Sequence, residues 1–343
     1  MRRGLTLGKF APFHRGHQLL LETALAEVDE LVVMVYPTAV TPIPLQVRAR
    51  WIQTLYPSVQ ILEAWDGPEG YGDTPEIRAE QETYILKKLN GLPITHFYSS
   101  EFYGEHVSQA LGAVDRRVDP ARRAVPISGT ALRADYFAGR DFIDPRVYAD
   151  LITKVCFMGA PFTGKTTLVK ALAAHYNTPW MPEYGGAYWL EHQVDRRITL
   201  EQFEEIAPEH NRRENALLQE SRTYLFCDTT PITTYVFAKD YHGCAGPILT
   251  RLAQEAEKQY DLFFLCDTDI PYADTWDRSG DQKRQWFQQQ ILGDLRERRI
   301  PFFTLRGTVD ERIAQVVAIL AQHQKFGNVL DIRQNHRGSW QGS

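Results

Sequence analysis

GKFAPFHRGH, residues 8–17, decides the fold of the first half of this chain. An apolar segment at residues 5–8 predicts a strand before it, and the apolar run after it predicts a helix. In doubly wound sheets such a turn binds phosphates, because the helix N-terminus offers free N–H groups and a positive dipole end. His14 and His17 would face the phosphate together, and Gly16 between them would let it approach closely.

The rest of this half alternates apolar strand-like segments with amphipathic helical ones. This pattern is typical of a parallel sheet that helices cover on both faces. We therefore expect a doubly wound α/β domain. The predicted strands are residues 5–8, 31–36, 59–62, 96–99 and 124–127, and the predicted helices are residues 16–26, 46–55 and 75–89.

ISGTALR, residues 127–133, follows the last predicted strand and begins another helix. Ser128 is predicted to cap this helix, and the residues beside it, including Thr130, expose backbone donors. Arg133 lies about a turn and a half further on, where it could reach a phosphate held at the helix start.

The second half opens with another phosphate-binding pattern, GAPFTGKTT at residues 159–167. It lies between a strand-like segment and a helical run, which is the context that the P-loop pattern GxxxxGKS/T requires. Its backbone N–H groups would wrap the phosphates of ATP, Lys165 would reach the β- and γ-phosphates, and Thr166 would supply an oxygen to Mg²⁺. The expected ATP-binding residues here are Gly159, Thr163, Gly164, Lys165, Thr166 and Thr167.

Two carboxylates and a charged stretch indicate a kinase. Glu183 and Asp228 follow the second and third predicted strands of this half, at the sheet edge where ligands bind. A hydroxyl acceptor benefits from a proton acceptor, so either acid could be the base while the other holds Mg²⁺ or a ribose hydroxyl. DRSGDQKR, residues 277–284, predicts a mobile lid whose Arg278 and Arg284 approach the transferring phosphoryl group.

A chain of 343 residues exceeds what one ordinary core accommodates, so we expect two domains. The second half is also predicted to be a doubly wound α/β domain, with strands at residues 154–158, 178–181, 224–227, 262–266 and 302–305. The predicted divisions are 1–143 for the first domain, 144–153 for a linker, 154–324 for the P-loop domain and 325–343 for a flexible tail.

Composition and charge argue against several classes of function. A net charge of -5 gives no global attraction to nucleic acid or to an anionic membrane surface. No apolar run approaches the roughly 20 residues of a spanning helix, and the chain begins directly with a strand-like segment, so we expect a cytoplasmic protein without membrane insertion. Cys156, Cys227 and Cys266 lie in short apolar runs and are predicted to be reduced core residues.

The phosphate-binding segments of the first half resemble the nucleotidyltransferase superfamily with HxGH and ISxTxxR signatures. This resemblance implies that a nucleotide phosphate attacks the α-phosphorus of ATP and expels pyrophosphate, with His14, His17 and Arg133 stabilising the triphosphate charge. SSEFYG at residues 99–104 and VRARWI at residues 47–52 resemble further segments of the family. The ATP-binding residues implied for this half are Gly8, Lys9, Phe10, Gly16, Ser99, Ser128 and Thr130.

EYGG, DTTPITTYVF and RSGDQKRQWFQQQ occur in this order behind the HxGH segment. In this combination the chain resembles the NadR-type family, in which nicotinamide-nucleotide adenylyltransferase is joined to ribosylnicotinamide kinase. The resemblance implies that the second domain phosphorylates nicotinamide riboside with ATP and Mg²⁺, and that the first converts the resulting nicotinamide mononucleotide to NAD. Lys165, Glu183, Asp228 and Arg278 would be catalytic in the kinase half, and Arg284 would contact ATP.

The chain also departs from this family. The family often continues EYG with an arginine, where this chain has Gly186. Some members carry an N-terminal helix-turn-helix repressor domain, whereas this chain reaches its first predicted strand within a few residues, so we do not expect nucleic-acid binding. Trp65, Tyr71 and Trp180 are candidates to stack on a pyridinium ring.

Two other functions remain compatible with the same residues. The architecture could act on the nicotinate form or on phosphopantetheine, together with another nucleoside. It could also serve as a nucleotide-sensing regulator that turns over slowly. The oligomeric state is open, and a homo-oligomer is compatible with the sequence.

Overall fold

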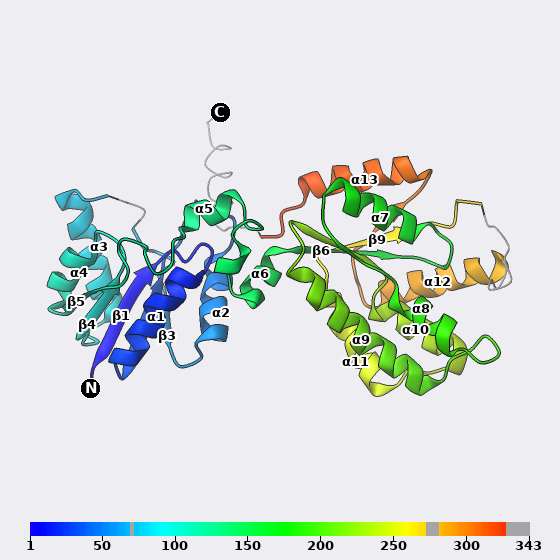
Figure 1. The fold of residues 1–343 in the computed structure, drawn as a ribbon, viewed down its shortest axis with the longest axis horizontal. Helices are drawn as coiled ribbons and strands as arrows, with labels where there is room; N and C mark the ends of the chain where they lie inside the picture. Colours follow the sequence, from blue (N-terminus) through cyan, green and yellow to red (C-terminus); the bar gives the residue numbers. More distant parts are fainter. Residues whose placement is uncertain (69–71, 272–280, 327–343) are drawn as a thin grey trace, which may run out of the picture. The chain divides into compact units, whose positions relative to one another are not determined.

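The computed structural model describes residues 1–68, 72–271 and 281–326, apart from the side chain of Asp281. Two compact units are present, Met1–Val147 and Tyr148–Lys325, and each contains its own five-stranded parallel sheet (Figure 1). This confirms the predicted fold class of two doubly wound α/β domains. Within the described ranges, no helix combines the length and apolar character that crossing a bilayer would need.

The sheet of the first unit has the strand order β3-β2-β1-β4-β5. Its elements are β1 (Arg3–Gly8), α1 (Arg15–Glu27), β2 (Glu30–Val35), α2 (Leu45–Leu55), β3 (Gln60–Glu63), α3 (Pro75–Leu89), β4 (His96–Ser99), α4 (Gly104–Leu111), β5 (Val114–Arg117), α5 (Gly129–Ala134), the 3-10 helix η1 (Arg140–Phe142) and α6 (Pro145–Leu151). The boundary between the two units falls within α6.

The central strand β1 pairs with β2 on one side and with β4 on the other. Leu5 lies opposite Val32 of β2 and Phe97 of β4, and all three side chains belong to the core. Ile85 of α3 and Val107 of α4 pack against the same core. The carboxyl ends of β1, β2 and β4 therefore meet at one edge of the sheet, which is where doubly wound folds bind ligands.

One predicted strand of the first unit is wrong. Residues 124–127 form no strand, and the fifth strand is β5, whose four residues are all exposed. The backbone at 123–125 is instead held in a turn, because the Asp119 carboxylate accepts the N–H groups of Arg123, Ala124 and Val125. An edge strand of mostly charged residues gives no apolar signal, so the sequence pattern did not reveal it.

The sheet of the second unit has the strand order β10-β9-β6-β8-β7. Its elements are β6 (Thr153–Met158), α7 (Lys165–His175), β7 (Trp180–Met181), α8 (Tyr184–His192), α9 (Leu200–Leu218), β8 (Tyr224–Asp228), α10 (Pro231–His242), α11 (Pro247–Gln259), β9 (Leu262–Cys266), α12 (Asp281–Glu297), β10 (Phe303–Leu305) and α13 (Val309–Gln322). The predicted strand at 178–181 is shorter than expected, since only its last two residues pair with β8.

Helices α7 and α13 cover one face of this sheet (Figure 1). Leu168 of α7 and Val316 of α13 pack on Val155 and Phe157 of β6. Cys156, Cys227 and Cys266 are buried, as predicted. Much of the predicted linker is helical in α6, and the Lys325 ammonium lies 3.1 Å from the Asp261 carboxylate of the second unit.

Candidate active sites

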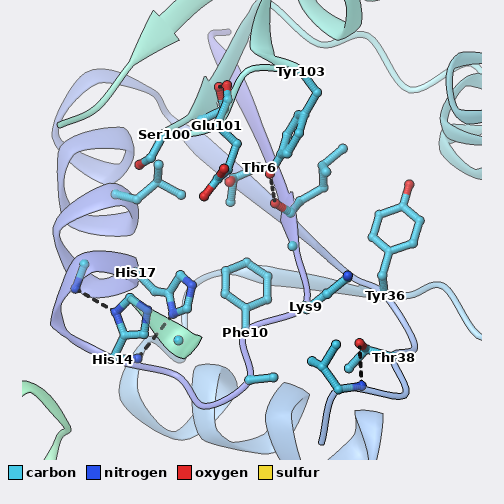
Figure 2. A pocket seen from close by; sticks show the side chains of 18 of the residues that line it. Thr6, Lys9, Phe10, His14, His17, Tyr36, Thr38, Ser100, Glu101 and Tyr103 are labelled. Atoms are coloured by element: carbon cyan, nitrogen blue, oxygen red, sulfur yellow. Dashed lines mark hydrogen bonds between the residues drawn. The ribbon is translucent and has the colours of Figure 1, made fainter. Parts of the chain in front are cut away.

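The first candidate site lies at the carboxyl end of β1, where the turn to α1 and the loops after β2, β3, β4 and β5 surround a cavity of about 910 Å³ (Figure 2). This volume lies in the range of ligand and cofactor pockets. The predicted site residues that line it are Gly8, Lys9, Phe10, His14, Gly16, His17, Ser99 and Arg133. The fold therefore brings together residues that are more than a hundred positions apart in the sequence.

His14 and His17 form a reciprocal cap at the start of α1 (Figure 2). The Gly16 N–H donates to Nδ1 of His14 over 3.1 Å, and the His14 N–H donates to Nδ1 of His17 over 3.3 Å. The two rings stack with their centroids 3.8 Å apart. A ring nitrogen that accepts a hydrogen bond carries no proton, so each neutral imidazole holds its proton on Nε2. Both histidines can therefore donate an Nε2–H to a bound phosphate.

Both imidazoles are neutral at physiological pH. Burial, reinforced by Arg122 and Arg133, lowers the pKa of His14 to about 4. Burial also holds the pKa of His17 well below its ordinary value, and His14 and Arg122 add to this effect. If these histidines stabilise a triphosphate, as predicted, they do so as neutral hydrogen-bond donors, and the positive charge must come from neighbouring side chains.

Three cationic side chains line the same cavity, those of Lys9, Arg122 and Arg133. Arg133 donates from Nη1 to the Ala11 carbonyl over 2.7 Å and from Nη2 to the Thr130 hydroxyl over 3.0 Å. The bond to Ala11 holds α5 against the turn after β1, and the bond to Thr130 lies within α5 itself. Like charges gathered in one cavity favour the binding of an anion that neutralises them.

Sequence reasoning missed Arg122. Its backbone has a φ of +51°, within the turn that the Asp119 carboxylate holds. Its Nη2 donates to Glu101 Oε1 over 3.2 Å, beside the cavity. The run of basic residues around it matches no motif, so only the fold of the turn reveals that it approaches the histidines.

Small residues shape the cavity walls. Ser128 caps α5 by accepting the Ala131 N–H over 3.2 Å, as predicted, and Gly129 beside it lines the cavity. A Cβ at Gly16 would lie 3.0 Å from the His14 ring, which is closer than ordinary packing. A glycine at this position therefore keeps the reciprocal histidine cap intact.

Arg48 supports the turn after β1 from the interior of the unit. Its side chain is buried, and it donates from Nε to the Ile43 carbonyl over 3.1 Å and from Nη1 to the carbonyls of Tyr36, over 2.9 Å, and Lys9. Burial lowers the pKa of Arg48 to about 10, so it stays charged at neutral pH. Arg48 thus joins the turn after β1 to the loop after β2, while Trp51, one turn further along α2, is buried core.

The three aromatic candidates for ring stacking lie in different places. Trp65 lines the first cavity. Trp180 packs against the core of the second unit, with the Lys170 ammonium 5.3 Å from its ring centroid. Tyr71 lies outside the described residues. Of the three, Trp65 is therefore the one that can be placed at a ligand cavity.

The second candidate site is the P-loop between β6 and α7. Gly159 and Gly164 have φ values of +141° and +82°, a region that favours glycine. A Cβ at Gly159 would lie 2.7 Å from the Cys266 carbonyl oxygen, so no side chain fits there. The buried Thr163 hydroxyl donates to the Ala160 carbonyl over 2.9 Å. These contacts keep the loop in one tight turn.

Lys165, Thr166 and Asp228 meet at the first turn of α7. The Lys165 Nζ donates to the carbonyls of Gly159 and Ala160, each over 3.0 Å. The Thr166 hydroxyl donates to Oδ2 of Asp228 over 2.5 Å. Asp228 is buried, and within the described part of the chain its Oδ1 has no hydrogen-bond partner. An orphaned buried carboxylate oxygen beside a P-loop hydroxyl fits the donor set that Mg²⁺ prefers.

Glu183 lies at the N-cap position of α8, makes no side-chain capping hydrogen bond within the described residues, and interacts electrostatically with Lys165 and Asp228. Burial raises the pKa of Glu183, the Lys165 ammonium opposes this rise, and the Asp228 carboxylate adds to it. A carboxylate with a raised pKa accepts a proton more readily, which suits a general base. A Cβ at Gly186 would lie 3.6 Å from the Glu183 carboxyl carbon, so a larger residue there would contact this acid.

The predicted lid is only partly described. Arg278 lies outside the described residues. Arg284, in α12, is buried and donates to the carbonyls of Thr268 over 3.1 Å and Ile270 over 3.2 Å. Contact of Arg284 with ATP therefore stays a prediction. Thr167 is exposed on the first turn of α7.

Comparison with known proteins relates these two sites to a family. Residues 5–135 match the cytidylyltransferase-like family, and residues 154–312 match an AAA domain. The trifunctional NAD biosynthesis/regulator protein NadR of Salmonella typhimurium is 27% identical over 340 residues, covering 93% of this chain and 82% of that relative. This chain belongs to the NadR-like proteins.

Further comparisons separate the two halves of this NadR-like protein. Its first half is similar to nicotinamide-nucleotide adenylyltransferase of Methanothrix thermoacetophila, 54% identical over 160 residues, which covers 45% of this chain and 89% of that relative. A crystal structure of NadR protein in complex with NAD and AMP-PNP shares the fold, with a TM-score of 0.52 and 20% identity over 93% of this chain and 95% of that one. The NadR-like chain is thus an enzyme with a nucleotidyltransferase-like unit and a kinase-like P-loop unit.

Proposed function

We propose that this NadR-like protein makes NAD in two steps, one at each site. The P-loop unit phosphorylates nicotinamide riboside, and the first unit joins the resulting mononucleotide to the adenylyl group of ATP. The observation that carries the proposal is the presence of both phosphate sites in one chain whose first half is 54% identical to a nicotinamide-nucleotide adenylyltransferase.

In the phosphorylation step, a riboside hydroxyl oxygen attacks the γ-phosphorus of ATP, the bond from that phosphorus to the β–γ bridging oxygen breaks, and ADP leaves. Glu183 takes the hydroxyl proton, since burial raises its pKa, while the Asp228 carboxylate is already bonded to the Thr166 hydroxyl. Lys165 neutralises the β- and γ-phosphates. Thr166 and Asp228 would hold Mg²⁺, which supplies further charge neutralisation when bound.

In the adenylyl step, the mononucleotide phosphate attacks the α-phosphorus of ATP and pyrophosphate leaves. This phosphate has a second pKa of about 6 and is already a dianion at neutral pH, so the step needs no general base. His14 and His17 donate their Nε2–H groups to phosphate oxygens. Lys9, Arg122 and Arg133 neutralise the departing pyrophosphate, so that positioning and charge stabilisation supply the catalysis.

Product analysis after incubation with nicotinamide riboside, ATP and Mg²⁺ tests this function. NAD, pyrophosphate and ADP should appear together. Turnover only with the nicotinate form, phosphopantetheine or another nucleoside would favour the alternative substrates. Binding of nucleotides without turnover would favour a sensor, although a sensor needs neither Lys165 nor an acid on the acceptor side.

A further inference from the structure

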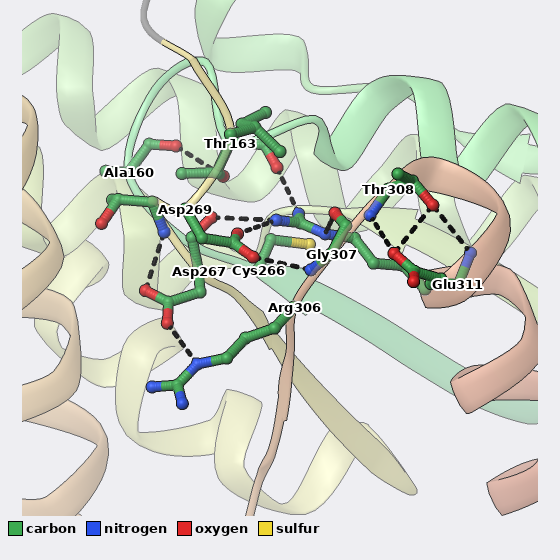
Figure 3. A network of polar contacts seen from close by, with 12 residues as sticks. Ala160, Thr163, Cys266, Asp267, Asp269, Arg306, Gly307, Thr308 and Glu311 are labelled. Atoms are coloured by element: carbon green, nitrogen blue, oxygen red, sulfur yellow. Dashed lines mark hydrogen bonds and ion pairs between the residues drawn. The ribbon is translucent and has the colours of Figure 1, made fainter.

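A buried arginine, Arg312, ties together three loops at the carboxyl edge of the second sheet. Figure 3 labels Thr163, Asp267 and Gly307, one residue of each loop. Arg312, in α13, is 2% exposed. Its Nη1 donates to the Thr163 carbonyl of the P-loop over 2.7 Å, its Nε to the Gly307 carbonyl over 3.0 Å, and its Nη2 to the Asp267 carbonyl over 3.2 Å. The Asp269 carboxylate pairs with the same guanidinium. One side chain therefore holds the P-loop, the loop after β9 and the loop after β10.

The two outer loops are also bonded to each other (Figure 3). The Gly307 N–H donates to Oδ2 of Asp269 over 2.6 Å, and the Arg306 Nε donates to Oδ2 of Asp267 over 2.7 Å. The Asp269 carboxylate thus serves Arg312 and the backbone of Gly307 together. These bonds, together with those of Arg312, join the three loops into one polar network.

The P-loop is held from a second side by α12. Gln288 is buried, its Oε1 accepts the Ala160 N–H over 2.8 Å, and its Nε2 donates to the Cys266 carbonyl over 3.0 Å. The peptide between Gly159 and Ala160 is therefore oriented so that its carbonyl faces Lys165. A similar constraint acts on the peptide between Thr163 and Gly164 at the other end of the loop.

A trans peptide points its carbonyl and its N–H in opposite directions. The Thr163 carbonyl and the Gly164 N–H belong to one such peptide. By binding the Thr163 carbonyl, Arg312 turns the Gly164 N–H away from itself. P-loops hold phosphates through backbone N–H groups of this kind, so the direction of each one affects catalysis.

We propose that Arg312 is a positioning residue of the kinase half. It fixes the Thr163 carbonyl so that the Gly164 N–H faces the ATP phosphates. It also holds the loops after β9 and β10 in place beside the P-loop. Arg312 acts through these backbone groups and makes no contact with the reacting atoms. The inference rests on the proposed kinase function, because it assigns a role in the same reaction.

Steady-state kinetics of Arg312→Met and Arg312→Lys in the full chain test the proposal. Methionine removes both the charge and the donors, whereas lysine keeps a charge beside Asp269 without the fork that binds three carbonyls. We expect kcat/KM for ATP in riboside phosphorylation to fall on the order of 10² for Arg312→Met and less for Arg312→Lys. Adenylyl transfer from ATP to supplied mononucleotide, measured in the same samples, should be unchanged.

Arg298→Met is the matched control. Arg298 lies in the same unit, its side chain is 13% exposed, it pairs with Asp294 over 2.6 Å, and it donates to the Ala253 carbonyl rather than to the P-loop. Its loss should lower the thermal unfolding temperature without changing KM or kcat for ATP. Equal stability losses in the two methionine variants, with kinase constants unchanged in both, would reduce Arg312 to a structural role and overturn the proposal.

Hydrogen exchange of the peptide 159–167, with and without ATP and Mg²⁺, separates this proposal from the proposed function. Wild type should show ATP-dependent protection of this peptide, and Arg312→Met should lose it. If wild type phosphorylates no riboside, the proposed function fails, but the exchange result still decides the role of Arg312. If Arg312→Met does not fold, retained protection in Arg312→Lys with an unchanged KM overturns the proposal.

Discussion

The Thr166 hydroxyl donates to the Asp228 carboxylate over 2.5 Å, across a separation of 62 residues. Thr166 belongs to the first turn of α7, whereas Asp228 ends β8, two strands away in sequence order. One carboxylate oxygen of Asp228 is used by this bond, and the other has no partner in the described residues. The pair therefore presents a hydroxyl and a carboxylate to the space beside the P-loop lysine.

Asp228→Asn should reduce riboside phosphorylation on the order of 10²- to 10³-fold. Asparagine preserves an acceptor for Thr166 but removes the negative charge that Mg²⁺ needs. The measurement is ADP formation with riboside over a range of Mg²⁺ concentrations, with adenylyl transfer to supplied mononucleotide as the control for folding. Wild-type kinase activity of the Asp228→Asn variant at every Mg²⁺ concentration would exclude Asp228 from the metal site.

Two further substitutions should separate the two reactions. Lys165→Ala should abolish riboside phosphorylation, since loss of one preorganised charge contact costs on the order of 10² to 10³ in rate, and adenylylation of supplied mononucleotide should survive. His17→Ala should do the opposite, so that riboside and ATP yield mononucleotide and ADP with little NAD. Both products can be followed by chromatography.

Mixing the two variants is the control for this dissection. The mononucleotide is small and diffusible, so NAD formation from riboside should return in the mixture. If His17→Ala leaves NAD synthesis intact, or if folded Lys165→Ala loses both activities, the assignment of one reaction to each unit fails.

The buried His14 should make stability depend on pH. Its pKa is lowered from 6.5 to about 4 in the folded chain. Above pH 6.5 neither state is protonated there, but as the pH falls from 6.5 toward 4 the unfolded state binds a proton that the folded state does not. Stability should therefore fall with decreasing pH in this window, by up to about 1.4 kcal/mol per pH unit.

The measurement is chemical unfolding of wild type and His14→Asn at pH 7 and pH 5. Asparagine can still accept the Gly16 N–H but does not titrate. The variant should lose part of the acid destabilisation. Identical pH slopes in the two proteins would show that His14 is not buried in the neutral form.

Nicotinamide mononucleotide should be a better acceptor than its nicotinate form. The carboxylates of Asp66, Glu101 and Asp119 line the first cavity together with the ring of Trp65. Beside Trp65 and Asp66, a cationic pyridinium is favoured and a substrate carboxylate is disfavoured, while Lys9, Arg122 and Arg133 attract the phosphates. The test is kcat/KM for both nucleotides, and a higher value for the nicotinate form would contradict the expectation.

Trp65→Ala should raise KM for the mononucleotide by about tenfold or less while KM for ATP stays unchanged.

Local motifs predicted the two phosphate sites. GKFAPFHRGH places His14, Gly16 and His17 within one turn of a helix start, and their mutual hydrogen bonds form inside that segment. The P-loop likewise contains its own glycines and its lysine. Buried central strands were predictable for the same reason, because apolar runs such as that of β6 are contiguous in sequence.

The sequence by itself determined these contiguous features: two α/β units, the turn after β1, the P-loop and the Ser128 cap of α5. Only the tertiary structure decided the exposed edge strand β5, the approach of Arg122 to the histidines, and the burial of Arg48 and Arg312 behind the two loops. The physical reason is that an arginine side chain can bind the backbone carbonyl of any residue type, so the residues it binds leave no mark in the sequence. Arg312 reaches the Thr163 carbonyl across 149 residues. No pattern of side chains records such a bond, and it exists only once the sheet has brought the loops together.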